Sequence, residues 1–178
     1  QAGRSVLIDA GIGITTDNGN LTLIANETAA NGVITAQRNA GAATIVMGNG
    51  ATLNAGTGNV LIELRDGAEN GNIVLGGIQG NSVSVNNLGT TGTITQNGVL
   101  TATTLGITNT VGSTDLSSLT NSISHLAAIQ SSGQNFSIRN AGTLDQTAPI
   151  TAAGLELLGA GAIYTLTNTG NAIATLAG

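Results

Sequence analysis

The sequence predicts an all-β fold, a single parallel β-solenoid with roughly 20 residues in each coil. Hydrophobic residues make up 40% of the 178 positions but aromatic residues only 1%, so Ile, Leu, Val and Ala must fill the core. Charged residues make up 7%, well below the usual share of about a quarter. A mean hydropathy of +0.26 and a net charge of −5 argue against a disordered chain. Short β-type runs between Gly, Asn and Thr corners favour a repetitive fold.

The β-type runs alternate apolar and small polar residues, which places one face inward and the other outward. The runs cover residues 5–9, 21–25, 44–47, 60–64, 73–75, 82–85, 91–95, 100–104, 136–139 and 162–166. The main runs begin near residues 5, 21, 43, 60, 82 and 99. We interpret each spacing of about 16–22 residues as one coil, which predicts roughly nine coils and a rod of about 40 Å.

Gly-Asn pairs precede several strands and are expected to form the corners. They occur at residues 19–20, 58–59, 71–72, 80–81 and 170–171. Glycine permits the positive φ of a tight corner, and asparagine bonds its own nearby backbone. Asparagines at equivalent corners are also expected to stack from coil to coil.

Residues 115–130 leave a choice between helix and coil. Leu116, Leu119 and Ile123 begin a near-helical spacing behind Asp115, a plausible helix cap. However, the pattern NxIxxLA at 121–127 returns at 171–177, fifty positions on, among Gly and Thr with no helical context. We therefore favour solenoid coil over a helical insertion at 113–133.

Several strings resemble the repeats of filamentous-haemagglutinin-like exoproteins: DNGNLTLIA at 17–25, GTGNVLIEL at 56–64 and ENGNIVLGG at 69–77. The NxIxxLA pattern is similar to later coils of such proteins. The resemblance implies a right-handed parallel β-helix, exported by two-partner secretion through an outer-membrane transporter and used for adhesion or biofilm building. The secretion domain of that family carries Asn-Pro motifs, whereas the one proline here, Pro149, follows Ala148. The chain thus resembles a shaft region.

The composition excludes several classes of function. The chain has no Lys and only four scattered Arg, so a basic surface for nucleic acid or an anionic membrane is not expected. It has no Cys, which removes disulfides and thiolate metal sites. No apolar run reaches the ~18 residues of a membrane span. The first residues contain no initiator Met and no signal peptide, so residues 1–178 are expected to be one solenoid segment of a longer exoprotein.

The densest charged stretch contains Glu63, Arg65, Asp66 and Glu69. Pectate-lyase-type enzymes are also β-helices and place acidic residues over a groove that holds Ca²⁺. We expect instead a solvated edge in which Glu63 and Arg65 share one face as an i,i+2 ion pair. The other carboxylates are isolated in sequence, although stacking could bring some together: Asp9, Asp17, Glu27, Asp115, Asp145 and Glu156.

His125 is the only histidine, so no second imidazole is present for a metal site. Its alignment with Thr175 in the repeated pattern predicts an ordinary outward position. No GxSxG motif precedes a helix, and no calcium-binding nonapeptide is present. Thr-rich runs allow an ice-binding lattice, but the periods vary too much for one.

We therefore predict no catalytic, cofactor-binding or metal-binding residues and no enzyme activity. The expected function is the structural or adhesive shaft of a secreted bacterial surface adhesin or extracellular filament, which binds a cell-surface receptor or polysaccharide. The alternative is a polysaccharide-active or carbohydrate-binding β-helix, for which three or more carboxylates with an Arg in a long groove would argue. Neither end carries an evident cap, so we also expect end-to-end self-association.

Overall fold

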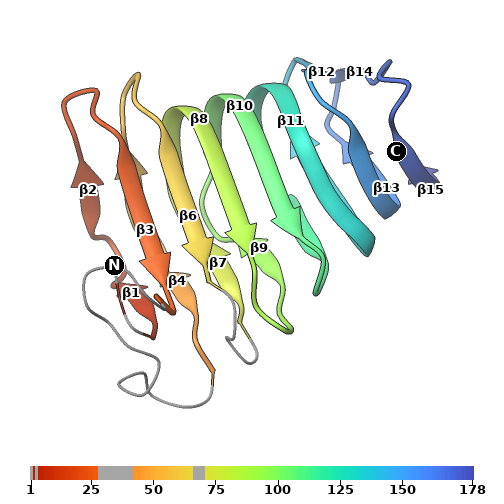
Figure 1. Ribbon diagram of the computed structural model, residues 1–178. Helices are drawn as coiled ribbons and strands as arrows, with labels where there is room; N and C mark the ends of the chain where they lie inside the picture. The colour runs from red at the N-terminus through yellow and green to blue at the C-terminus, as the bar shows by residue number, and fades with distance from the viewer. Residues whose placement is uncertain (1, 3, 28–41, 66–70) are drawn as a thin grey trace.

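The computed structural model describes residue 2 and residues 4–27, 42–65 and 71–178. No helix occurs among these residues, and Figure 1 shows a stack of parallel β-strands. The strands are β1 (Val6–Ile8), β2 (Gly13–Thr15), β3 (Leu21–Ala25), β4 (Ile45–Met47), β5 (Thr52–Asn54), β6 (Val60–Leu64), β7 (Ile73–Leu75), β8 (Gly77–Asn87), β9 (Ile94–Gln96), β10 (Leu100–Asn109), β11 (Thr114–Asn140), β12 (Thr143–Gln146), β13 (Ile150–Leu158), β14 (Ile163–Thr165) and β15 (Ala172–Ala177).

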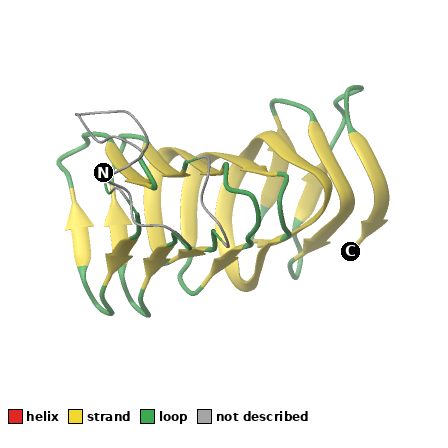
Figure 2. Ribbon diagram, turned by 60° about the horizontal axis from the view of Figure 1, so that its bottom comes forward, coloured by secondary structure: helices red, strands yellow, loops and turns green. Residues whose placement is uncertain are grey.

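Every strand pairing among the described residues is parallel and joins one turn of the chain to the next. The strands β1, β4, β7 and β9 form one stack, and the start of β11 follows them. The strands β3 and β6 form a second stack, which the second half of β8 continues. The result is a β-solenoid of about six turns, with roughly 22 residues from turn to turn, which confirms the predicted fold class. Figure 2 shows the strands on the separate sides of this stack.

The expectation of roughly nine coils is wrong, because neighbouring runs in the sequence belong to the same turn. Val6 in β1 pairs with Ile45, and Leu21 in β3 pairs with Val60. The runs that begin near residues 5 and 21 therefore lie on two sides of the first turn. Six turns at ~4.8 Å correspond to a rod of about 25–30 Å instead of about 40 Å.

The core is one continuous column of aliphatic side chains. Along β6, Val60, Ile62 and Leu64 are buried, and the residues between them are partly exposed. This alternation follows from the strand geometry, in which successive side chains point to opposite faces. Phe136 is the one aromatic residue among the buried core side chains of the described chain, so burial depends on branched aliphatic residues, as the composition predicts.

Residues 115–130 form strand, which confirms the choice of coil over helix. They belong to β11, and Leu116, Ile123, Leu126 and Ile129 are all buried in the core. The near-helical spacing of these residues arises where the alternation breaks along β11, since the successive buried residues Ile123, Leu126 and Ile129 are an odd number of positions apart. A corner shifts the alternation of inward and outward residues, so the strict period of two is lost.

The glycines of the Gly-Asn pairs do not have a positive φ, and at Gly58 it is the small size of the residue that the contact between turns requires. Among the described residues the positive-φ positions include Gly50 and Asn18, and none is the glycine of a Gly-Asn pair. A Cβ on Gly58 would lie 2.4 Å from the carbonyl oxygen of Gly19 in the preceding turn. Only glycine permits this close approach of two backbones.

Asparagine ladders form in part. The Asn20 side-chain oxygen accepts the Asn59 backbone N–H at 2.9 Å, and that of Asn59 accepts the Ser82 N–H at 3.2 Å. The ladder therefore links side chains to the backbone of the next turn.

No helix among the described residues is long and apolar enough to cross a membrane.

Candidate functional site

The charged stretch around Arg65 forms an ion-pair cluster with a buried carboxylate. The Arg65 Nε atom lies 2.9 Å from Glu63 Oε1, and Nη1 lies 3.1 Å from Glu27 Oε1. Asn86 donates a hydrogen bond to Glu63 at 3.3 Å. The i,i+2 pair predicted from the sequence is present, and stacking adds Glu27, which lies 38 positions before Arg65.

The burial of this cluster indicates a structural role. The Glu27 side chain is 1% exposed and that of Arg65 34% exposed. A carboxylate without access to solvent cannot receive a polymer substrate, but it does need the guanidinium to offset the loss of its hydration. Asp66 and Glu69 lie outside the described residues.

The other carboxylates stay apart. Asp9, Asp17 and Asp115 are exposed, and Asp115 accepts hydrogen bonds from the hydroxyl and the backbone N–H of Ser117. Within the described ranges, no group of three His, Cys, Asp or Glu residues is placed to hold a metal ion.

His125 is paired with a carboxylate from the next turn. Its Nδ1 atom contacts Asp145 Oδ1, and both side chains are more than a third exposed. The outward position was predicted, but the partner was not, because Asp145 stands twenty positions away in the sequence. Register alone brings the two together, since His125 and Asp145 face each other across β11 and β12.

This pair does not assemble a nucleophilic triad. Thr104 occupies the register position of His125 in the preceding turn. Among the hydrogen bonds of the described residues, none joins the Thr104 hydroxyl to the imidazole. A hydroxyl without a base within hydrogen-bond reach is a poor nucleophile.

Two amide pairs, one buried and one partly buried, form a feature that the sequence analysis did not predict. Gln96 and Asn121 exchange two side-chain hydrogen bonds of 2.9 and 3.0 Å. Gln146 and Asn171 exchange two of 2.8 and 2.9 Å. In each pair the asparagine oxygen also accepts a backbone N–H at 2.9 Å, from Leu100 in the first pair and Ile150 in the second.

The two amide pairs are copies at a distance of fifty residues. The same distance relates Thr101-Ala102 to Thr151-Ala152 and Leu105 to Leu155, in addition to the 121–127 and 171–177 segments. Gln96 and Gln146 are also fifty positions apart, so the fifty-residue repeat extends upstream of the asparagines. This longer repeat could have predicted that each glutamine pairs with the corresponding asparagine. Stacked residues here are 19–22 positions apart, so fifty residues exceed two turns and place the second pair at a different corner.

Tyr164 lies in the inward column of the last turn, in register with the buried Leu144. Its hydroxyl donates to the carbonyl of Leu158, and burial raises its pKa. This tyrosine is a packing residue with a satisfied hydroxyl.

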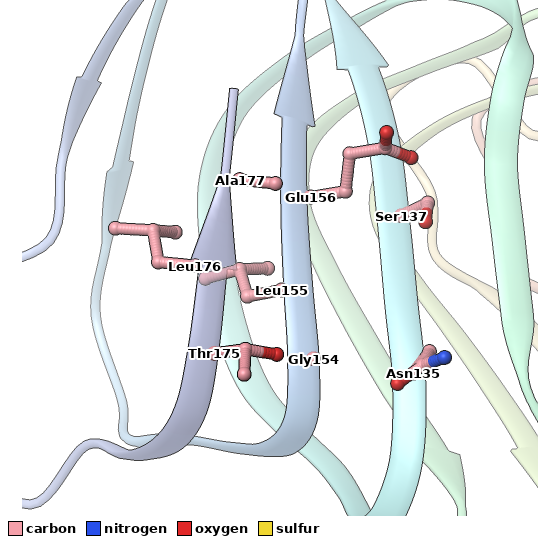
Figure 3. Close-up of a pocket in the computed structure, with 8 residues that line it drawn as sticks. All are labelled: Asn135, Ser137, Gly154, Leu155, Glu156, Thr175, Leu176 and Ala177. Carbon is pink, nitrogen blue, oxygen red and sulfur yellow. The ribbon is translucent and has the colours of Figure 1, made fainter.

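A hollow of about 250 Å³ opens on the outward face of β11, β13 and β15. Gly154 lies between Asn135 and Thr175 in register, and Ser137 and Glu156 stand beside this row (Figure 3). The Glu156 side chain extends toward Ser137 on the neighbouring strand.

No family model, no curated protein and no solved structure matches this chain. The fold and the described side chains are therefore the evidence for function. The features available to support a function are the solenoid rod, the ion pairs around the buried Glu27, the partly exposed His125–Asp145 pair and a hollow lined by both polar and apolar side chains.

Proposed function

We propose that this chain is the noncatalytic shaft of a secreted bacterial surface adhesin or extracellular filament. The observation that supports this most is the architecture, since a stack of about six turns around one aliphatic core is a quasi-one-dimensional rod. Such a rod can hold a binding surface away from the cell that carries it, and this role requires no catalytic site. The resemblance of its repeats to filamentous-haemagglutinin-like exoproteins points the same way.

The placement of charge also supports a shaft over a polysaccharide-cleaving β-helix. An enzyme of that kind needs accessible carboxylates and a basic residue over a groove. Here Arg65 pairs with Glu63 and with the buried Glu27, and the described aspartates are scattered. Saccharide binding without cleavage stays compatible with the shaft.

Adhesion of the immobilised chain to bacterial cells, host cells and neutral or anionic polysaccharides tests this proposal. We expect retention on at least one surface, and we expect His125→Ala to retain it fully. The chain should release no reducing ends and no unsaturated products from those polysaccharides. Cleavage that His125→Ala or Glu63→Ala abolishes would contradict the noncatalytic role.

A further inference from the structure

The hollow at Gly154 is shaped by the lack of one side chain in an outward row. A Cβ at this position would lie 2.7 Å from Asn135 Oδ1 and 3.2 Å from Thr175 Oγ1. The register of β11 shifts between Ser131 and Asn135, and this irregularity precedes the hollow. Irregularities of this kind re-aim side chains, and they are frequent beside binding sites.

The polar groups around the hollow have unused hydrogen-bonding capacity. Among the described residues, the side chains of Asn135, Ser137 and Glu156 form no hydrogen bond. Elsewhere on the outward faces, comparable groups bond across turns: Asn72 accepts from the Thr93 hydroxyl at 3.3 Å. The hollow is therefore lined by a carboxylate, an amide and a hydroxyl from two neighbouring strands, with the Glu156 carboxylate beside Ser137 and the Asn135 amide beside Gly154 (Figure 3).

This chemistry matches a neutral saccharide. A carboxylate accepts hydrogen bonds from two adjacent hydroxyls, and an amide both donates and accepts. One carboxylate is too few for a Ca²⁺ site, which takes 6–8 oxygen ligands. An anionic sugar is disfavoured, since Glu156 faces the hollow and the chain carries a net charge of −5. The volume of about 250 Å³ lies below that of drug-sized pockets, about 300–1,000 Å³, and suits a single ring.

We propose that Asn135, Ser137, Glu156 and Thr175 form a binding site for one neutral sugar unit, held through a vicinal diol, in the hollow at Gly154. This site rests on the adhesive role proposed above and gives that role a ligand class. Several rods that each carry a site for one sugar unit would bind a polysaccharide through many weak contacts at once.

A second hollow of about 270 Å³, on another side of the rod, also has a glycine in its outward row but no carboxylate. Gly77 takes the outward position there in register with Thr52, and a Cβ would meet the Thr52 methyl at 3.1 Å. Asn54, Gln79 and Thr101 supply the amides and the hydroxyl, with no charged residue in the lining. The recurrence of a glycine notch between amides and hydroxyls supports a shared, uncharged ligand.

The test fills the hollow with one methyl group. Gly154→Ala is the test variant, because Gly154 has no positive φ and the atoms that its Cβ would meet end flexible side chains. Gly106→Ala is the matched control, since its Cβ would meet only ordinary contacts at 3.7 Å or more. Glu156→Gln keeps the shape of the hollow but removes the charge.

Binding is measured by NMR titration of the labelled 178-residue chain with mannose, galactose and glucose oligosaccharides, with heparin oligosaccharide as the anionic comparator. We expect millimolar binding of at least one neutral probe, with shifts of the amides of residues 135–137 and 154–156. Gly154→Ala should weaken it at least tenfold and Glu156→Gln severalfold, while Gly106→Ala leaves it unchanged.

Three results would overturn the site: no neutral probe binds, Gly154→Ala binds as well as the original chain, or heparin binds more tightly than every neutral probe. The adhesion assay described above distinguishes failure of the proposed sugar site from failure of the proposed adhesive role. A chain that adheres to cells equally well with Gly154→Ala keeps the adhesive role and loses the site.

Discussion

The turns before residue 65 and those after residue 71 are built differently. In the first part, strands are three to five residues long and end at every corner. Val6 stacks on Ile45 and Ile45 on Ile73, at distances of 39 and 28 residues. In the second part, β11 runs for 27 residues, and stacked residues are 19–22 positions apart, as for Asn135 and Gly154 or Leu100 and Ile78.

Turns of nearly equal length, with register shifts of only one or two residues, accompany the long strands. When every turn has the same length, each corner lies directly on the corner before it, and the backbone ladder continues through the bend. When one turn is longer than its neighbour, the backbone at its corner has no stacked backbone to bond to. The strand therefore ends at that corner. The solenoid stays intact because the flat sides still stack.

The two parts also satisfy buried polar groups in different ways. The early turns bury the Glu27 carboxylate against the Arg65 guanidinium. The later turns bury neutral amides, Gln96 with Asn121, at a corner. Amide pairs avoid the desolvation cost of a buried charge and bond the backbone as well.

The largest effect is expected from Asn121→Leu. Its side chain is 1% exposed and bonds Gln96, the Leu100 N–H and two backbone carbonyls. Removal leaves several buried groups without partners, which should lower the free energy of unfolding by about 3–5 kcal/mol. Denaturant unfolding measures this loss.

Two matched variants sharpen that prediction. Asn171→Leu removes the copied pair in the last turns, where the partners are only half buried, and should cost about 1–2 kcal/mol. Asn135→Leu on the same strand as Asn121 removes an amide that has no protein partner among the described residues, and should change stability by about 0.5 kcal/mol or less. Equal losses for all three would show that the amide pair is not the cause.

In the early turns, Arg65→Met is expected to cost about 2–3 kcal/mol. The variant leaves Glu27 as a buried charge, and the cost falls below that of a fully buried pair because Arg65 is a third exposed. The double variant Glu27→Gln/Arg65→Met should recover most of the loss.

Arg139→Met is the control for that experiment. Arg139 donates to the Ser117 carbonyl at 2.8 Å and has no carboxylate partner within the described residues, so its loss should cost about 1 kcal/mol. A double variant as unstable as Arg65→Met alone would mean that the Glu27 charge does not dominate.

The sequence predicted the fold class because alternation and corner residues are local signals. It predicted the Glu63–Arg65 pair for the same reason, because Glu63 lies in β6 and Arg65 directly follows that strand. It did not predict the number of turns, Glu27 beside Arg65 or the His125–Asp145 pair, because these depend on which residues stack. In a solenoid with unequal turns, the length of each turn decides which residues stack. That length can be determined only when each strand has been assigned to one side of the solenoid.

The smallest effect is expected at His125 and Asp145. Both side chains are more than a third exposed, so solvent screens their interaction and little is gained by holding them together. His125→Ala and Asp145→Ala should each lower the free energy of unfolding by less than about 1 kcal/mol, with a coupling of about 0.2–1 kcal/mol that decreases with added salt. A double-mutant cycle in thermal or denaturant unfolding, at low and high ionic strength, measures this coupling. A salt-independent coupling of about 2 kcal/mol or more would be typical of desolvated groups. The His125–Asp145 pair would then stabilise the contact between its two turns about as much as a buried amide pair does.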